Sequence, residues 1–343
     1  MSNRIPPHKR TVPTVAIFIL LSLSYFLKVG AVESLLPWAR LPWADAIPLV
    51  KLPSASMTQL GGWIQSFESV RPVWSALIAY LLIILGATAT MRLTILHNLY
   101  DKASYTPLVI YLAVFASLAS PHEILAPAIV GLVMVVSLYE LYAGYSRHEN
   151  THNIFSGCFW IGLIALIYPS AVILWPIIFV VIILFDRIGR ELPVALAALV
   201  TPFLLLFYCG WLFSETSFAE QFWSWRVAFA YPHRAFAYLF SGGFTSAYLV
   251  RLILSILICA GLSILSVVNI ERISIALMSR TRIVYAMLLS IVVLFIAAAP
   301  SFTFASLLMA TPALAITLSA ALFEIEERWS MWTYLVFILI SMI

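Results

Sequence analysis

The chain has 343 residues, of which 63% are hydrophobic and only 10% are charged, and its mean hydropathy is +1.03. Soluble globular domains do not reach these values, so the main solvent of this chain is lipid and not water. The formal net charge of +4 is spread in ones to threes of basic residues between apolar stretches, which argues against nucleic acid as a partner.

Long apolar stretches recur along the whole chain and predict membrane-spanning helices. A stretch of about 20 apolar residues crosses a hydrocarbon core of roughly 30 Å, and the stretches lack the alternating polarity of barrel strands. We therefore predict an all-α fold, a polytopic transmembrane helical bundle of about 10–11 helices, built as a single integral membrane domain over residues 1–343. The predicted segments are 12–32, 73–90, 105–119, 124–145, 154–168, 171–186, 192–214, 247–269, 283–298, 303–322 and 329–343.

Some of these segments are short, and two pairs leave a choice open. The pairs that flank Ser120–Glu123 and Pro169-Ser170 could be tight helical hairpins that cross the bilayer or partly re-entrant segments. The first segment is also open to two interpretations, because charges followed by an apolar run are typical of secretory signal peptides and of uncleaved first helices. The apolar region extends to Val32, which favours the uncleaved helix.

Basic residues in the connections predict the orientation of the chain. Lys and Arg concentrate in cytoplasmic loops, and their alternation here places the N-terminus in the cytoplasm. We expect a multi-pass protein of a bacterial inner (cytoplasmic) membrane. The residues placed on the cytoplasmic side are Arg4, Lys9, Arg10, Arg92, Lys102, Arg147, Arg187, Arg190, Arg272, Arg280, Arg282 and Arg328, whereas Arg40, Lys51, Arg71, Arg226 and Arg234 are exceptions on the opposite side.

Two long loops, 33–72 and 215–246, fall on the extracytoplasmic side and are predicted to lie on the membrane surface. Each carries aromatic residues at helical spacing, which indicates an interfacial amphipathic helix. In the first loop the apolar positions are Met57, Leu60, Trp63, Ile64 and Phe67, opposite Thr58, Gln59, Gln65 and Glu68. In the second loop Phe218, Phe222, Trp223, Trp225 and Phe229 alternate with charged residues such as Glu215 and Glu220.

The ionisable residues on the extracytoplasmic side are few, and they are the candidates for chemistry. The acids are Glu33, Asp45 and Glu68 in the first long loop and Glu123, next to His122, in a short connection. Burial near the membrane surface could make Glu123 a general base. The alternative is that Ser120-Pro121-His122-Glu123 only starts a helix, with Ser120 as its cap.

A second group of candidates lies in the other long loop. Arg226, Tyr231, His233 and Arg234 suit a phosphate, since arginine presents a planar fork to phosphate oxygens. A lipid headgroup would satisfy the same residues without catalysis. Cys158, Cys209 and Cys259 fall inside apolar segments without a CxxC pair, so we expect reduced, buried thiols, no metal site and no cofactor.

Two resemblances add to these patterns. The stretches from Leu96-His97-Asn98 to Tyr105 and from Asn153 to Leu163, followed by Tyr168-Pro169, resemble an uncharacterised family of bacterial polytopic membrane proteins over residues 70–205. The layout as a whole is similar to that of the C-type glycosyltransferases, which take sugars from polyprenyl-phosphate donors. It has a first helix, a long first loop with an acid and amphipathic helices, and a tight second loop with another acid.

The second resemblance implies roles for particular residues. Asp45 or Glu33 would match the first-loop base, Glu123 with His122 would take the second-loop role, and Arg226 or Arg234 would contact the phosphate. The chain departs from the family pattern because it lacks a large C-terminal extracytoplasmic domain and an Asp-Glu or Glu-Asp pair in those loops.

Three functions are compatible with the sequence. The first is a glycosyltransferase-like enzyme that acts at the outer face on a lipid-linked, phosphate-bearing substrate, with membrane lipid and a polyprenyl-phosphate-linked molecule as partners. The alternative is a non-enzymatic subunit or scaffold of a cell-envelope assembly machine, which would bind an envelope protein. The third is a transporter, which requires polar residues at mid-membrane.

Overall fold

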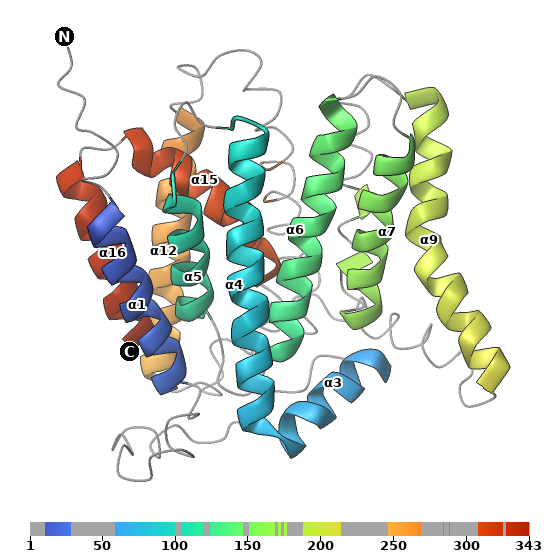
Figure 1. Cartoon of the computed structure of the whole chain (residues 1–343), viewed down its shortest axis with the longest axis horizontal. Coiled ribbons are helices and arrows are strands. Elements are labelled where there is room, and N and C mark those ends of the chain that lie inside the picture. Colours follow the sequence, from blue (N-terminus) through green and yellow to red (C-terminus); the bar gives the residue numbers. More distant parts are fainter. Residues whose placement is uncertain are drawn as a thin grey trace.

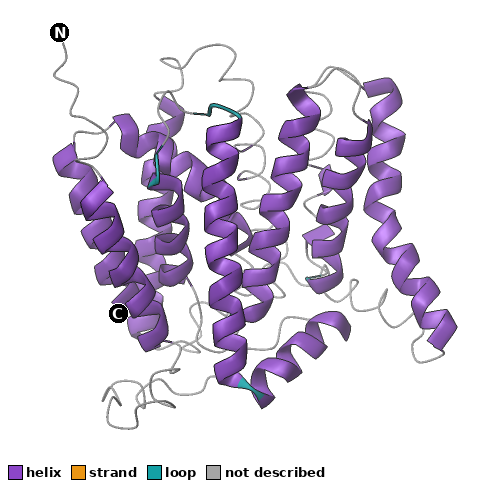
Figure 2. Cartoon of the chain, in the orientation of Figure 1, coloured by secondary structure: helices purple, strands orange, loops and turns teal. Residues whose placement is uncertain are grey.

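The computed structural model describes residues 11–28, 59–99, 104–118, 124–146, 151–168, 171–172, 175–176, 188–213, 246–268, 284, 288, 308–324 and 327–342. Within these ranges every regular element is a helix (Figure 2). The elements are α1 (Thr11–Lys28), α3 (Gln59–Val70), α4 (Pro72–Leu96), α5 (Thr106–Leu118), α6 (Leu125–Ser146), α7 (Thr151–Ile167), α9 (Ile188–Phe213), α12 (Ser246–Val268), the 3₁₀ turn η5 (Leu308–Ala310), α15 (Thr311–Glu324) and α16 (Glu327–Met342).

These helices confirm the predicted all-α bundle. Nine of the eleven predicted segments contain an α-helix in the described part of the chain. The segments 171–186 and 283–298 lie almost wholly outside the described residues. By length and composition, Pro72–Leu96 and Leu125–Gly144 suffice to cross a membrane, and shorter apolar helices of 10–17 residues occur in α1, α5, α7, α9, α12 and η5–α15.

Most of the helices run side by side, and α3 is the exception. It lies across one end of the bundle, below α6 and α7 in the view of Figure 1, and it packs against α4, α6 and α7. The C-terminal part of α1 and the first residues of α4 and α6 lie at this same end, because Tyr25 contacts Ala76 and Glu68 contacts Ile124. We call it the elbow end, after the bend between α3 and α4.

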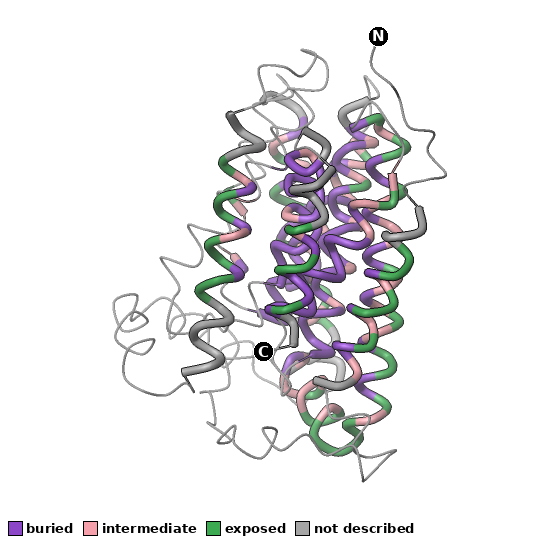
Figure 3. Tube along the Cα trace, turned by 90° about the vertical axis from the view of Figure 1, so that its left-hand side faces the viewer, coloured by how far each residue is buried: buried purple, intermediate pink, exposed green. Residues whose placement is uncertain are grey.

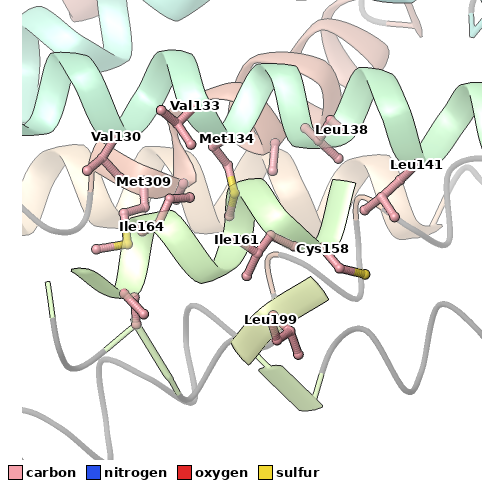
Figure 4. Packing of buried hydrophobic residues seen from close by; sticks show 14 of the residues in the cluster. Val130, Val133, Met134, Leu138, Leu141, Cys158, Ile161, Ile164, Leu199 and Met309 are labelled. Atoms are coloured by element: carbon pink, nitrogen blue, oxygen red, sulfur yellow. The ribbon is translucent and has the colours of Figure 1, made fainter. Parts of the chain in front are cut away.

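Two hydrophobic clusters hold the bundle together. One joins α6, α7 and α9, where Met134, Ile161 and Leu199 meet (Figure 4). The other joins α1, α5, α15 and α16, and it includes Leu21, Phe115 and Phe337. Side chains from α4 enter both clusters, since Leu93 belongs to the first and Ile83 to the second. The predicted first helix is therefore an integral part of the packing.

The outer helices carry an apolar surface that suits lipid. Buried residues concentrate on the inner helices and exposed ones along the outer helices (Figure 3). The exposed large apolar side chains include Leu77, Leu81 and Leu85 on one face of α4 and Leu254, Leu257 and Ile264 on α12. A water-soluble protein rarely exposes continuous apolar faces of this kind, whereas a membrane protein presents them to acyl chains.

The sequence stretch from Asn153 to Leu163 forms most of α7, and its glycines allow close helix packing. A Cβ on Gly157 would lie 2.9 Å from Cγ of Leu141 in α6, and a Cβ on Gly162 would lie 2.6 Å from the carbonyl oxygen of Leu199 in α9. Ser137 of α6 donates a hydrogen bond of 2.9 Å to the Gly157 carbonyl. Small residues let helix backbones approach in this way in membranes.

The other stretch of that resemblance ends α4. Asn98 has a φ of 46°, in the left-handed region. Leu99 N–H donates to the Thr94 carbonyl at 3.0 Å and Asn98 N–H donates to the Ile95 carbonyl at 3.2 Å. These are the two bonds of a Schellman-type C-cap, for which asparagine is a common alternative to glycine. Asn98, Gly157 and Gly162, which belong to the stretches that carry the family resemblance, therefore have structural roles here.

Candidate functional site

The predicted site residues lie outside the described residues. This holds for the acids Glu33, Asp45 and Glu123 with His122. It also holds for the predicted phosphate-binding residues Arg226, Tyr231, His233 and Arg234. Their roles stay predictions. The structure does describe the segments that border them, since α3 and Arg71 close the first long loop and Ile124 directly follows His122-Glu123. Among the described residues, the candidate site therefore lies at the elbow end.

The bend between α3 and α4 follows from Pro72. Proline has no backbone N–H to continue the helical hydrogen-bond ladder, and it moves the preceding residue out of the α region. Arg71 accordingly has φ −134° and ψ 66°, and Pro72 is the first residue of α4. The Arg71 N–H still donates to the Phe67 carbonyl, and the Arg71 carbonyl accepts from Ser75 N–H, both at 3.0 Å. The chain thus turns within one residue.

The amphipathic helix predicted in the first long loop is present as α3, and its apolar residues differ in exposure. Leu60 and Ile64 pack against the hydrophobic clusters of the bundle. Trp63 and Phe67 instead face outward, with 71% of the Trp63 side chain exposed. The apolar positions share one side of α3, as their spacing predicts, but only Leu60 and Ile64 pack against the bundle, whereas Trp63 and Phe67 remain exposed where an interfacial helix meets lipid.

Glu68 lies one turn beyond Ile64 and contacts the start of α6. Its Oε1 accepts a hydrogen bond of 2.8 Å from the backbone N–H of Ile124, 56 residues further along the chain. The first N–H groups of a helix have no partner inside the helix, and they attract negative charge. The carboxylate therefore satisfies one of these donors and joins the end of the first long loop to the start of α6. The sequence pattern predicts Glu68 opposite the apolar positions of the helix, and the structure shows that it is partly buried there against the start of α6.

Arg71 places a positive charge at the bend. Its side chain is exposed, and its guanidinium makes no ion pair or hydrogen bond with any described residue. The neighbouring Val70 and Trp74 side chains are 76% and 61% exposed. A guanidinium beside exposed tryptophan and valine at a membrane surface suits a ligand with a phosphate head and an apolar chain.

Aromatic side chains line the bundle next to this bend. Tyr25 of α1 stacks on Tyr80 of α4 with ring centroids 5.5 Å apart, and Phe26 lies 4.5 Å from Tyr80. The Tyr25 hydroxyl donates a hydrogen bond of 3.3 Å to the Ala76 carbonyl, and it lies within electrostatic range of Glu68. These contacts hold the first turns of α4 against α1.

The predicted burial of the cysteines is confirmed for the two whose side chains the structure describes. Cys158 and Cys259 are free and buried, and the side chain of Cys209 lies outside the described residues. Among the described side chains, no group of three or more His, Cys, Asp or Glu residues is arranged to hold a metal ion.

The comparisons with known proteins identify the fold. No protein-family model and no curated protein matches the chain. Among solved structures, the chain is similar to the crystal structure of ArnT from Cupriavidus metallidurans bound to undecaprenyl phosphate, with a TM-score of 0.55 and 14% sequence identity. The match covers 96% of this chain and 63% of the ArnT chain, so the chain spans less than two thirds of ArnT.

From this similarity the chain is a multi-pass helical membrane protein with a fold similar to that of ArnT. The predicted likeness in layout to the C-type glycosyltransferases is confirmed at the level of the fold. At 14% identity the similarity concerns the fold alone.

Proposed function

We propose that this protein is a transferase of a bacterial inner membrane that takes a sugar from a polyprenyl-phosphate-type lipid at the extracytoplasmic face. The observation that carries the proposal is the fold match with ArnT over 96% of the chain, since that ArnT structure contains undecaprenyl phosphate. The elbow end supplies the matching chemistry, namely an exposed guanidinium between apolar residues at a membrane surface. With a cytoplasmic N-terminus, this end of the bundle faces the extracytoplasmic side.

In this proposal Arg71 contacts the lipid phosphate, together with Arg226 or Arg234. The phosphate leaves as an anion when the bond between the sugar and the phosphate oxygen breaks, and the oxygen keeps the electron pair. Guanidinium groups lower the energy of that developing charge. Tyr231 and His233 donate further hydrogen bonds to the same phosphate. A polyprenyl chain would lie along the exposed apolar residues beside the bend.

The acids are proposed to act on the acceptor. Asp45 or Glu33 removes the proton of the acceptor hydroxyl while its oxygen forms the new bond to the anomeric carbon. Glu123, beside His122, is the second acid, and it precedes the residue whose N–H is held by Glu68. Exchange of each acid for its amide removes the proton acceptor without a large change of shape, so transfer should fall by about 100-fold or more for the true base.

The experiment that tests the proposal measures lipid binding. The full chain in nanodiscs is titrated with undecaprenyl phosphate and, in parallel, with undecaprenol, which lacks the phosphate. Arg71→Ala should weaken binding of the phosphate lipid about 10- to 100-fold, the value of a lost charged hydrogen bond, and should leave undecaprenol unchanged. Arg92→Ala is the matched control, because Arg92 is exposed near the opposite end of the same helix.

Catalysis needs a separate measurement. Purified protein is incubated with radiolabelled undecaprenyl-phosphate-linked sugars and membrane lipid acceptors, and release of undecaprenyl phosphate is followed. Asp45→Asn, Glu33→Gln and Glu123→Gln are compared with Glu149→Gln, which lies in a connection predicted to be cytoplasmic.

If the wild-type protein binds undecaprenyl phosphate no better than undecaprenol, the transferase proposal fails, and the scaffold and transporter functions take its place.

A further inference from the structure

The bend between α3 and α4 needs support from outside the helix. Pro72 interrupts the backbone ladder there, so α3 does not continue as a rigid extension of α4. The inner face of α3 rests on the bundle through the partly buried Leu60 and Ile64, near the beginning and middle of the helix. Arg71 lies outside this contact, directly after the last residue of α3.

Glu68 supplies the support at that end. Its carboxylate accepts the Ile124 N–H at 2.8 Å and is partly buried in the contact. A charged acceptor at a helix N-terminus makes a stronger bond than a neutral pair, because the free N–H groups and the helix dipole both favour the negative charge. Glu68 is three residues before Arg71, so the bond fixes the turn from which the guanidinium projects.

We infer that Glu68 is a positioning residue for the phosphate-binding Arg71. The inference rests on the proposed function, because it concerns the same lipid phosphate. Glu68 itself does not contact the phosphate; a carboxylate would repel it. The carboxylate instead holds the last turn of α3 against the start of α6, which keeps the adjoining Arg71 in a constant position.

The sign of the effect on binding separates this role from a simple charge effect. If Glu68 acted only through its negative charge, its removal would strengthen binding of an anionic lipid. If it positions Arg71, Glu68→Ala weakens binding, and Glu68→Gln, which keeps an acceptor oxygen but loses the charge, restores most of the affinity.

The first measurement tests the hydrogen bond without any ligand. Hydrogen–deuterium exchange of the Ile124 amide is followed by mass spectrometry in nanodiscs. Glu68→Ala should exchange about 10- to 100-fold faster at this amide than wild type, while Glu68→Gln should lie between them. Amides in the middle of α6, such as that of Met134, serve as the control and should not change. Unchanged exchange at Ile124 in Glu68→Ala overturns the inference.

The second measurement is a double-mutant cycle on the affinity for undecaprenyl phosphate. Glu68→Ala should weaken binding about 3- to 100-fold in the wild-type background and by less than about twofold when Arg71 is already alanine. Equal effects in both backgrounds would show that Glu68 acts independently of Arg71, and would overturn the inference. A wild-type protein that does not bind the lipid would instead refute the proposed function, and exchange at Ile124 would still report on the bond.

Discussion

The contact between α7 and α9 predicts a large difference between two chemically identical substitutions. In Gly162→Ala the new Cβ would lie 2.6 Å from the Leu199 carbonyl oxygen and 3.1 Å from Cγ of Pro202. The oxygen belongs to the backbone of α9 and cannot rotate away, so the two helices must separate. Overpacking costs about 1–3 kcal/mol, and the higher helix propensity of alanine returns about 0.5–1 kcal/mol, which leaves a net loss of up to about 2.5 kcal/mol.

The matched control is Gly261→Ala in α12. A Cβ at Gly261 meets nothing within 4 Å, so only the gain in helix propensity remains, and stability should stay the same or rise by up to about 1 kcal/mol. Equilibrium unfolding of the two variants in mixed micelles measures the difference. If Gly162→Ala is as stable as Gly261→Ala, the close approach of α7 and α9 is incorrect.

Two further predictions concern single residues in the interior and at a helix end. The Tyr111 hydroxyl is fully buried and has no hydrogen-bond partner among the described residues, so Tyr111→Phe should leave the free energy of unfolding unchanged or raise it by up to about 1 kcal/mol. Gly86→Ala would place a Cβ 2.6 Å from that hydroxyl, and its destabilisation should be smaller in the Tyr111→Phe background; equal losses in both backgrounds would contradict the contact. Because Asn98 has a positive φ, Asn98→Gly should be tolerated, whereas Asn98→Val should lose about 1–2 kcal/mol in the same unfolding assay, and equal stability of the two would exclude the left-handed C-cap.

The helices could be predicted from the sequence because their signal is local. A stretch such as Pro72–Leu96 is apolar all round, and the predicted segment 73–90 finds its start at the proline but ends six residues before Leu96. The length of the first long loop and the presence of an amphipathic helix in it could also be predicted from the sequence. The orientation of α3 was not, because Trp63 and Ile64 have similar hydrophobicity and only the tertiary contacts decide which of them meets the bundle.

The roles of Glu68 and Arg71 at the elbow end could not be predicted from the sequence. Glu68 appeared as one of several loop acids and Arg71 as an exception to the charge rule, and neither was chosen as a site residue. The bond from Ile124 to Glu68 spans 56 positions, and no periodicity connects such distant residues. The available signal was Pro72, which predicts a helix boundary. It therefore places Glu68 in the last turn of the helix before the boundary and Arg71 at the boundary itself. The acids Asp45 and Glu123 remain predictions from the sequence.

Site-specific photocrosslinking tests the central claim most directly, that the elbow end binds a polyprenyl phosphate. A benzophenone amino acid replaces Trp74 near the bend or Ile95 at the other end of the same helix; both side chains are exposed, by 61% and 41%. Each protein is irradiated in nanodiscs with labelled undecaprenyl phosphate. If the elbow end binds the lipid, an adduct forms at position 74 that saturates, is competed by unlabelled undecaprenyl phosphate and is lost in Arg71→Ala. Equal, unsaturable labelling at both positions, or preferential labelling at position 95, would contradict this claim.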